Sequence, residues 1–177
     1  MKMIFAVLSV LGLAFASEVS AHGPTPQKVV ESIVIDRPIE KVWDKVKDFG
    51  AIGQWNPALS KSEAQGGNQP GDKRTLVFQN GEQLVEELDF YDEKTYEYDY
   101  RLKDVNVKAL PASSYSAVLK LTPEGQGTKV EWKSRLYRGD TSNFPPDDLN
   151  DEAAVQAMQT FFKTGLENLK RIVESEN

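Results

Sequence analysis

Carboxylates are the side chains that could perform acid–base chemistry in this chain. They gather in acidic stretches at 86–89, 92–93 and 147–148, and two such groups around one substrate could act as general acid and general base. Alternation along a strand would place Glu86 on one face and Glu87 on the other. If the inner face is apolar, at most one carboxylate of this strand is therefore expected in an interior site, and most of the acidic residues are expected in solvent.

Nucleophilic and metal chemistry have few candidate side chains. The chain contains no Cys and one His, His22. If cleavage made His22 the N-terminal residue, its amine and imidazole would form half of a copper-binding histidine brace. No second His is present to complete the brace or to act as a base for Ser113-Ser114, which also lack a G-x-S-x-G turn. We therefore expect no catalytic residue, no metal site and no cofactor.

Aromatic side chains are better candidates for a binding site than these polar groups. If the fold leaves a pocket, they are the residues that we expect to line it. The alternative is that they pack as plain core, as aromatic residues usually do. The predicted lining consists of Trp55, Tyr98, Tyr100, Tyr115, Trp132, Phe161, Phe162 and Leu166.

A long amphipathic helix, predicted over residues 151–174, organises the rest of the chain. Its apolar residues recur at steps of three and four, so Leu166 should be buried and Lys163 exposed. The prolines at 145–146 cannot continue a helix and mark its start. At about 1.5 Å per residue the helix spans roughly 35 Å and must lie across a wide sheet. Gly165 interrupts the apolar face and predicts either a close backbone approach or room left beside the buried face.

The chain before this helix is expected to form a sheet. A first strand over 28–37 is followed by two short helices, which begin after Pro38 and end before Pro57. Asn80-Gly81 is the strongest turn signal and predicts a two-residue hairpin loop with positive φ at both positions. Without strand–helix alternation, this order favours an α+β fold. Six further strands are expected at 59–66, 74–80, 83–92, 95–102, 115–122 and 129–137.

The first 21 residues have the pattern of an export signal. Lys2 precedes an apolar run, and Val19-Ser20-Ala21 is a small-residue sequence of the kind that signal peptidase cuts after. We expect cleavage after Ala21 and a periplasmic protein with no membrane association. One domain is expected over 22–177, ordered over 28–175. The alternative is an uncleaved N-terminal anchor.

Composition limits the partners that the protein could bind. The net charge is −6, and Lys and Arg are scattered along the chain, which argues against nucleic acid and anionic membrane surfaces. Without Cys there are no disulfides, so stability must come from the core. The composition favours a basic protein or a small neutral ligand over an acidic partner.

The loop at 141–148 is a candidate surface for protein contacts. It follows Arg138 and contains Phe144 and two prolines, so it is either a rigid flap beside a pocket or a docking surface. An exposed Phe144 would favour docking, whereas a Phe144 packed under the helix N-terminus would make the loop structural. Phe144 and Arg138 are the predicted partner-binding residues.

A family resemblance rests on the order of the elements and on two short segments. Pro38-Ile39-Glu40-Lys41-Val42-Trp43-Asp44 and Trp55-Asn56-Pro57 resemble the START-like superfamily, also called SRPBCC, which includes the birch pollen allergen and the bacterial polyketide cyclase and lipid-transport group. The resemblance implies a helix-grip fold of the α+β class. In that fold a curved antiparallel sheet wraps around a long C-terminal helix, with two short helices after the first strand and a cavity between sheet and helix.

A narrower resemblance covers three segments, at 22–29, 110–116 and 137–141. They are similar to the MxaD proteins of methylotrophic bacteria. This likeness implies a periplasmic accessory protein of methanol oxidation, which assists the interaction of methanol dehydrogenase with cytochrome cL. No catalytic motif comes with the resemblance.

Three classes of function are therefore in competition. The first is the non-enzymatic accessory protein, with methanol dehydrogenase and cytochrome cL as partners. The second is a periplasmic carrier of a small hydrophobic ligand or lipid. The third is a cyclase- or hydrolase-type enzyme, which would need a buried carboxylate within hydrogen-bond reach of a Tyr or Arg. We rank them in this order and expect the protein not to be an enzyme.

Overall fold

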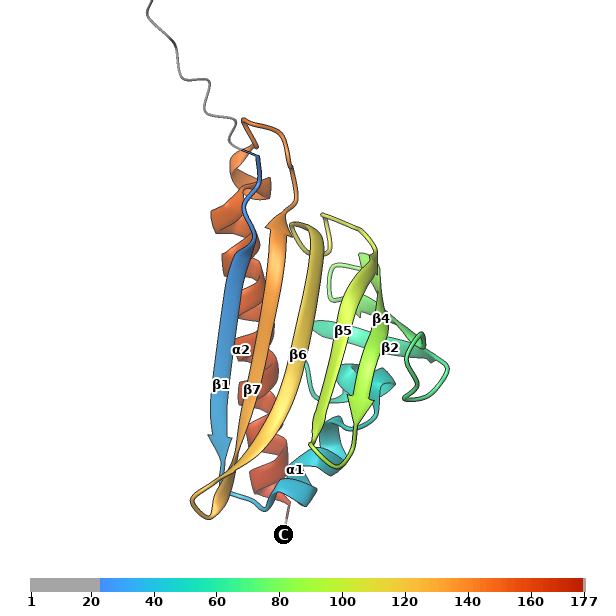
Figure 1. Ribbon diagram of the computed structural model, residues 1–177, viewed down its shortest axis with the longest axis vertical. Helices are drawn as coiled ribbons and strands as arrows, with labels where there is room; N and C mark the ends of the chain where they lie inside the picture. Colours follow the sequence, from blue (N-terminus) through green and yellow to red (C-terminus); the bar gives the residue numbers. More distant parts are fainter. Residues whose placement is uncertain (1–22, 177) are drawn as a thin grey trace, which may run out of the picture.

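A computed structural model describes residues 23–176 of the chain (Figure 1). The predicted signal peptide, its cleavage site after Ala21 and His22 lie outside the described residues. No helix in the described range is long and apolar enough to cross a membrane. The elements are β1 (Gln27–Ile35), α1 (Ile39–Val46), the 3-10 helix η1 (Phe49–Gln54), β2 (Leu59–Gln65), β3 (Lys73–Phe78), β4 (Gln83–Asp92), β5 (Glu97–Asp104), β6 (Ala112–Glu124), β7 (Gly127–Arg138), the 3-10 helix η2 (Asp147–Leu149) and α2 (Asp151–Ser175).

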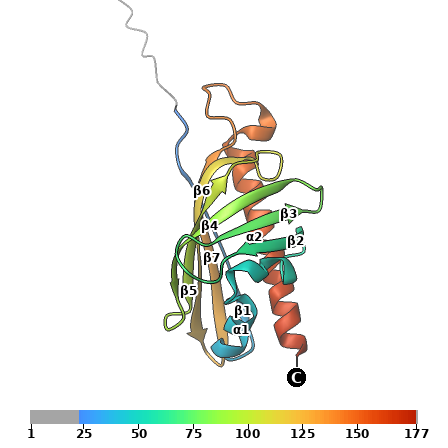
Figure 2. The same cartoon turned by 90° about the vertical axis from the view of Figure 1, so that its right-hand side faces the viewer.

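The seven strands form one antiparallel sheet in the order β1-β7-β6-β5-β4-β3-β2. The register of β4 against β5 shifts twice, between Val85 and Glu86 and between Leu88 and Phe90. Such bulges bend a strand and increase its twist. The sheet therefore curves, and Figure 2 shows α2 along its concave side, with β2 and β3 reaching round toward the helix. This is the α+β helix-grip architecture that was predicted.

Helix α2 begins where the sequence places it. The side chain of Asn150 accepts a hydrogen bond from the Ala153 backbone N–H at 2.9 Å and caps the helix. Leu166 is buried at 2% exposure, and Lys163 lies on the exposed side, as the periodicity predicted. The buried stripe packs against β1 and β7, which are adjacent in the sheet.

Gly165 leaves room on the buried face of α2 for side chains of the segment after η1, which is the second of the two predicted alternatives. A Cβ atom at this position would lie 2.8 Å from Asn56 Nδ2 and 3.2 Å from Trp55 Cζ3. The Asn56 amide donates to the Phe161 carbonyl at 3.2 Å, and Asn168 donates to the Trp55 carbonyl at 2.9 Å. Side-chain hydrogen bonds thus hold the segment at 55–56 against α2.

The two short helices lie where they were expected, although the second is a 3-10 helix. Val42, Trp43 and Val46 form the buried face of α1. Asp48 then caps η1, because its carboxylate accepts from the Gly50 backbone N–H at 2.9 Å. A 3-10 helix suits such a short segment, since its tighter hydrogen bonds rarely extend beyond a few residues.

The predicted two-residue hairpin loop at Asn80-Gly81 is wrong. Of these two residues, Gly81 has a positive φ, at 83°, and Asn80 does not. Its N–H bonds the Phe78 carbonyl at 3.0 Å, and the Phe78 N–H bonds the Glu82 carbonyl at 2.9 Å. This is a three-residue loop, in which a type I turn is followed by a left-handed glycine. Because Asn80 accepts the Glu82 N–H at 3.0 Å, its side chain stabilises this alternative.

Candidate ligand-binding site

A surface groove of about 510 Å³ lies between α2 and the rim of the curved sheet. Its volume falls within the range typical of small-molecule sites. Side chains from the residue before β2, the end of β3, the loop after β5, η2 and the N-terminal half of α2 enclose it. The groove is lined by Ala58, Phe78, Ala109, Leu110, Asp148, Ala153, Gln156, Ala157, Thr160 and Phe161.

The groove exists because small residues face one another across it. Ala153 and Ala157 are four residues apart, so they lie on the same side of α2, and Ala58 and Ala109 contribute to the lining as well. The aromatic part of the lining includes Phe161, whose ring centroid lies 5.7 Å from that of Phe78. The result is a mainly apolar surface with a few polar groups, which suits a mainly apolar ligand.

The eight predicted lining residues are all buried and belong to one core cluster. Trp132 lies at its centre: its ring stacks on Phe162 at 4.1 Å between centroids and lies 5.3 Å from Trp55. Phe161 is the one member of the set that also lines the groove. The predicted lining therefore fills much of the space between sheet and helix, and its role in contacting ligand stays a prediction.

A polar network is buried within this aromatic core. Arg74 Nε donates to Glu86 Oε2 at 2.5 Å, and Tyr115 donates its hydroxyl to Glu86 Oε1 at 2.6 Å. The guanidinium carbon of Arg74 lies 4.0 Å from the Phe49 ring centroid and 4.6 Å from that of Tyr100. Such stacking between aromatic faces is favourable for a desolvated cation.

The tyrosines around this network are held in their neutral form. Burial raises the pKa of Tyr98 to about 12. Burial and then the negative charge of Glu86 raise the pKa values of Tyr100 and Tyr115 well above the ordinary value. The Tyr100 hydroxyl accepts from the Trp132 indole N–H at 2.8 Å, so it is tied to the same core.

Glu86 meets the geometric criterion stated above for an enzyme, because it is buried and bonded to both a Tyr and an Arg. Each of its oxygens is already engaged, however, one by Tyr115 and one by Arg74. None of these three residues is among those that line the groove. A general base must lie within hydrogen-bond reach of its substrate, and in this arrangement Glu86 serves as an internal ion-pair partner.

Sequence comparison supplies the family. Residues 26–174 match the family described as polyketide cyclase/dehydrase and lipid transport. The chain belongs to this family. No curated protein matches the sequence.

Solved structures share the fold of this polyketide cyclase and lipid-transport family member. A protein from Nitrosospira multiformis has 26% identity and a TM-score of 0.67, with 84% of this chain and 97% of that chain covered. A protein from Thermobifida fusca has 27% identity and a TM-score of 0.64, over 82% and 92% of the two chains. Ara h 8.0201 has 19% identity and a TM-score of 0.67, over 86% and 100%, and shows the fold alone.

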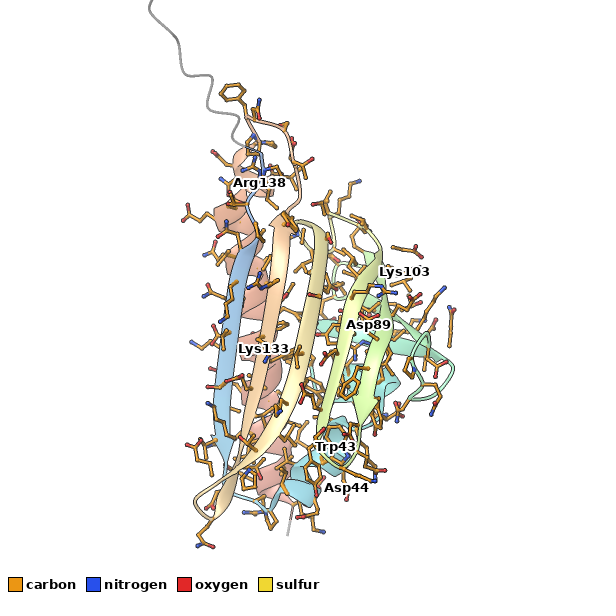
Figure 3. The ribbon with its side chains drawn as sticks, in the orientation of Figure 1. Trp43, Asp44, Asp89, Lys103, Lys133 and Arg138 are labelled. Carbon is orange, nitrogen blue, oxygen red and sulfur yellow. The ribbon has the colours of Figure 1, made fainter. Side chains whose placement is uncertain are left out.

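The loop after β7 places the two predicted partner-binding residues in different environments. Phe144 is 93% exposed, so it is not packed under the N-terminus of α2. Arg138 is 8% exposed and lies at the base of the loop (Figure 3). It donates to the carbonyls of Asp140 at 2.8 Å and Ser142 at 2.7 Å and to Asp151 Oδ2 at 3.0 Å. Arg138 thus holds the loop that presents Phe144.

Sequence reasoning missed most of the groove and half of the ion pair. Ala153 and Ala157 could have been noticed as small residues on one flank of the helix. Arg74 gave no such signal, because Lys73 beside it is also basic and alternation does not say which of the two points inward. Only the pairing of Arg74 with Glu86 across β3 and β4 identifies the buried one.

Proposed function

We propose that this protein is a non-enzymatic binder of a small, mainly apolar ligand, which it holds in the groove beside α2. The observation that carries the proposal is the 510 Å³ hollow, bounded by Ala153, Ala157 and Phe161 of the helix and by Phe78 and Leu110 of the sheet side. Membership of a family described by cyclase, dehydrase and lipid-transport activities supports a ligand-binding role.

Binding without catalysis is supported by the state of Glu86. The Glu86 carboxylate is buried, accepts hydrogen bonds from Tyr115 and Arg74, and is not among the residues that line the groove. The polar side chains of the lining are Gln156 and Thr160, which are neutral and suited to orienting a ligand by hydrogen bonds, and Asp148, whose carboxylate is exposed to solvent rather than buried.

Filling the groove tests this proposal. The neutral apolar dye N-phenyl-1-naphthylamine should gain fluorescence when it is added to the protein. Ala157→Trp should weaken this binding by about tenfold or more, because the larger side chain would fill part of the groove. A loss of about 1.4 kcal/mol in binding free energy corresponds to a factor of ten. Gln159→Trp, on an exposed position of the same helix, is the matched control and should bind like the wild type. Equal binding by both variants would refute the assignment.

A second role is supported by Phe144, and we propose it as the biological setting. An aromatic side chain that is 93% exposed, on a loop held by Arg138, is suited to docking another protein. Together with the resemblance to the MxaD proteins, this supports a periplasmic accessory role between methanol dehydrogenase and cytochrome cL. The experiment is to add the purified protein to these two partners and to measure cytochrome reduction.

A further inference from the structure

The outer face of the sheet, opposite α2, carries two groups of basic side chains that differ in their pairing. On β5, Arg101 lies 2.7 Å from Glu87 and Lys103 lies 3.1 Å from the same carboxylate. Hydrogen bonds from Lys103 and then from Arg101 lower the pKa of Glu87, and they outweigh the opposite effect of burial. Lys103 and Asp89 appear on this side of the face in Figure 3. The charges of this group are matched.

The second group, on β1 and β7, differs in its pairing. Lys28 is the direct cross-strand partner of Arg135, and Lys133 lies two residues before Arg135 on the same face of β7 (Figure 3). Within residues 23–176, none of the three forms an ion pair, whereas Lys129 of the same strand pairs with Glu131 at 3.5 Å. The carboxylate of Asp99 on β5 is near enough for the charge of Lys133 to act against the rise in its pKa that burial causes. Lys28 and Arg135 are like charges directly opposite each other, which destabilise a sheet, so this arrangement favours a further negative counterpart.

Two adjoining hollows accompany these cations. One, of about 190 Å³, is lined by Lys28, Lys133, Arg135, Ser116 and others. The second, of about 320 Å³, shares Ser116 and Arg135 with the first and extends to Tyr137 on one side and to the ion-paired Arg101 of β5 on the other. We call this combined surface the outer groove and define it by Lys28, Ser116, Val118, Lys133, Arg135 and Tyr137.

We propose that the outer groove docks an extended acidic segment of a partner protein. Lys133, Arg135 and Tyr137 occupy alternate positions of one strand, so they present two cations and an aromatic ring in a line about 13 Å long, at roughly 3.3 Å per residue. An extended chain with carboxylates at alternate positions has the same period. Because the outer groove is a shallow, open surface formed along strands, it fits a linear segment better than an enclosed small molecule.

This binding would act at short range. The whole protein carries a net charge of −6, so its overall field does not attract an acidic partner. Contacts within the outer groove must supply the attraction, and salt should weaken them. Composition alone argued against acidic partners, because a count of charges averages over faces that differ. The inference goes beyond the proposed ligand-binding function and does not depend on the groove beside α2.

A labelled peptide provides the test. Fluorescence anisotropy would follow the binding of a fluorescein-labelled peptide of four Glu-Ser repeats to the full mature chain, with four Gln-Ser repeats as the neutral peptide. Lys133→Gln/Arg135→Gln should weaken binding by roughly tenfold, in keeping with two partly exposed charge pairs. Lys94→Gln/Lys108→Gln removes the same charge from other exposed positions and should change binding by less than about twofold.

The outcomes separate the possibilities. Tighter binding of the Glu-Ser peptide by wild type than by Lys133→Gln/Arg135→Gln, with the control variant like wild type, supports the proposal. Equal weakening by both variants, or equal binding of the neutral peptide, overturns it. Binding of phosphatidylglycerol vesicles with the same variant dependence, but not of the peptide, also overturns it and assigns the surface to membranes. Ala157→Trp should leave peptide binding unchanged, because Ala157 is not part of the outer groove. A failure of the ligand-binding proposal can therefore be distinguished from a failure of the peptide-docking proposal.

Discussion

Arg74 and Glu86 face each other across β3 and β4, and the Nε atom of Arg74 lies 2.5 Å from Glu86 Oε2. Both side chains are at most 1% exposed. A second nitrogen of Arg74, Nη1, donates to the Phe49 carbonyl at 2.7 Å. The pair therefore joins two neighbouring strands to the start of η1 inside an aromatic core.

Removing one member of this pair should be far more damaging than removing both. Glu86→Ala leaves the Arg74 cation buried without its partner, and such losses cost about 3–5 kcal/mol of unfolding free energy. Arg74→Met/Glu86→Leu removes both charges and should cost clearly less. Urea unfolding of both variants measures the difference. If the double variant is no more stable than the single variant, then pairing with Glu86 is not what allows the Arg74 cation to be buried in the core.

Gly165→Ala should destabilise the protein although alanine favours helices. The added Cβ would lie 2.8 Å from Asn56 Nδ2, so the bond from Asn56 to the Phe161 carbonyl must shift. Overpacking costs about 1–3 kcal/mol, which exceeds the gain in helix propensity of about 1 kcal/mol. In an Asn56→Ala background the clash is relieved, and the same change should become neutral or stabilising. Thermal melts of the four proteins decide this.

The buried tyrosines predict a loss of stability at alkaline pH. Burial raises the pKa of Tyr98 to about 12, and Tyr100 and Tyr115 are raised well above the ordinary value. The unfolded chain loses these protons near pH 10, while the folded chain keeps them. Unfolded protein then binds fewer protons, so stability falls as pH rises above about 10. Tyrosinate absorbance and circular dichroism should change together, and tyrosinate formation at these residues in the folded state would contradict the prediction.

The accessory role predicts a rate effect that depends on Phe144. The protein should raise the rate of cytochrome cL reduction by methanol dehydrogenase and leave the dye-linked activity of the dehydrogenase unchanged. Phe144→Ser should reduce the gain, because it removes the exposed ring without touching the bonds of Arg138. If steering by charge causes the gain, it should shrink as salt rises from about 0.01 to 0.15 M. No gain at any salt concentration would remove this role and leave ligand binding alone.

Local periodicity was enough to predict the elements and the direction of α2. The alternation of Leu166 and Lys163 between inside and outside follows from the helical repeat, and the close contact at Gly165 follows from its place on the apolar face. The loop at Asn80-Gly81 was mispredicted, because the same two residues suit either hairpin geometry and the hydrogen bonds of Phe78 and Glu82 decide between them.

The candidate site was harder to predict, because it depends on pairs that are distant in sequence. The groove forms where alanines of α2 meet Ala58 and Ala109, and no local pattern shows that these residues will face one another. The unmatched cations Lys28 and Arg135 are likewise adjacent only through the pairing of β1 with β7. Patterning along the chain predicts which side chains face inward, whereas strand order and packing decide which of them meet.

Nuclear magnetic resonance with the neutral dye can show directly whether the groove beside α2 binds a ligand. Amide signals of ¹⁵N-labelled protein would be followed during titration with N-phenyl-1-naphthylamine. We expect the largest shifts to cluster at Phe78, Leu110, Ala153, Ala157 and Phe161, and we expect Ala157→Trp to abolish them while Gln159→Trp does not. Shifts centred on the outer face around Lys133 and Arg135, or none at saturating dye, would contradict the claim that the groove beside α2 is the ligand site.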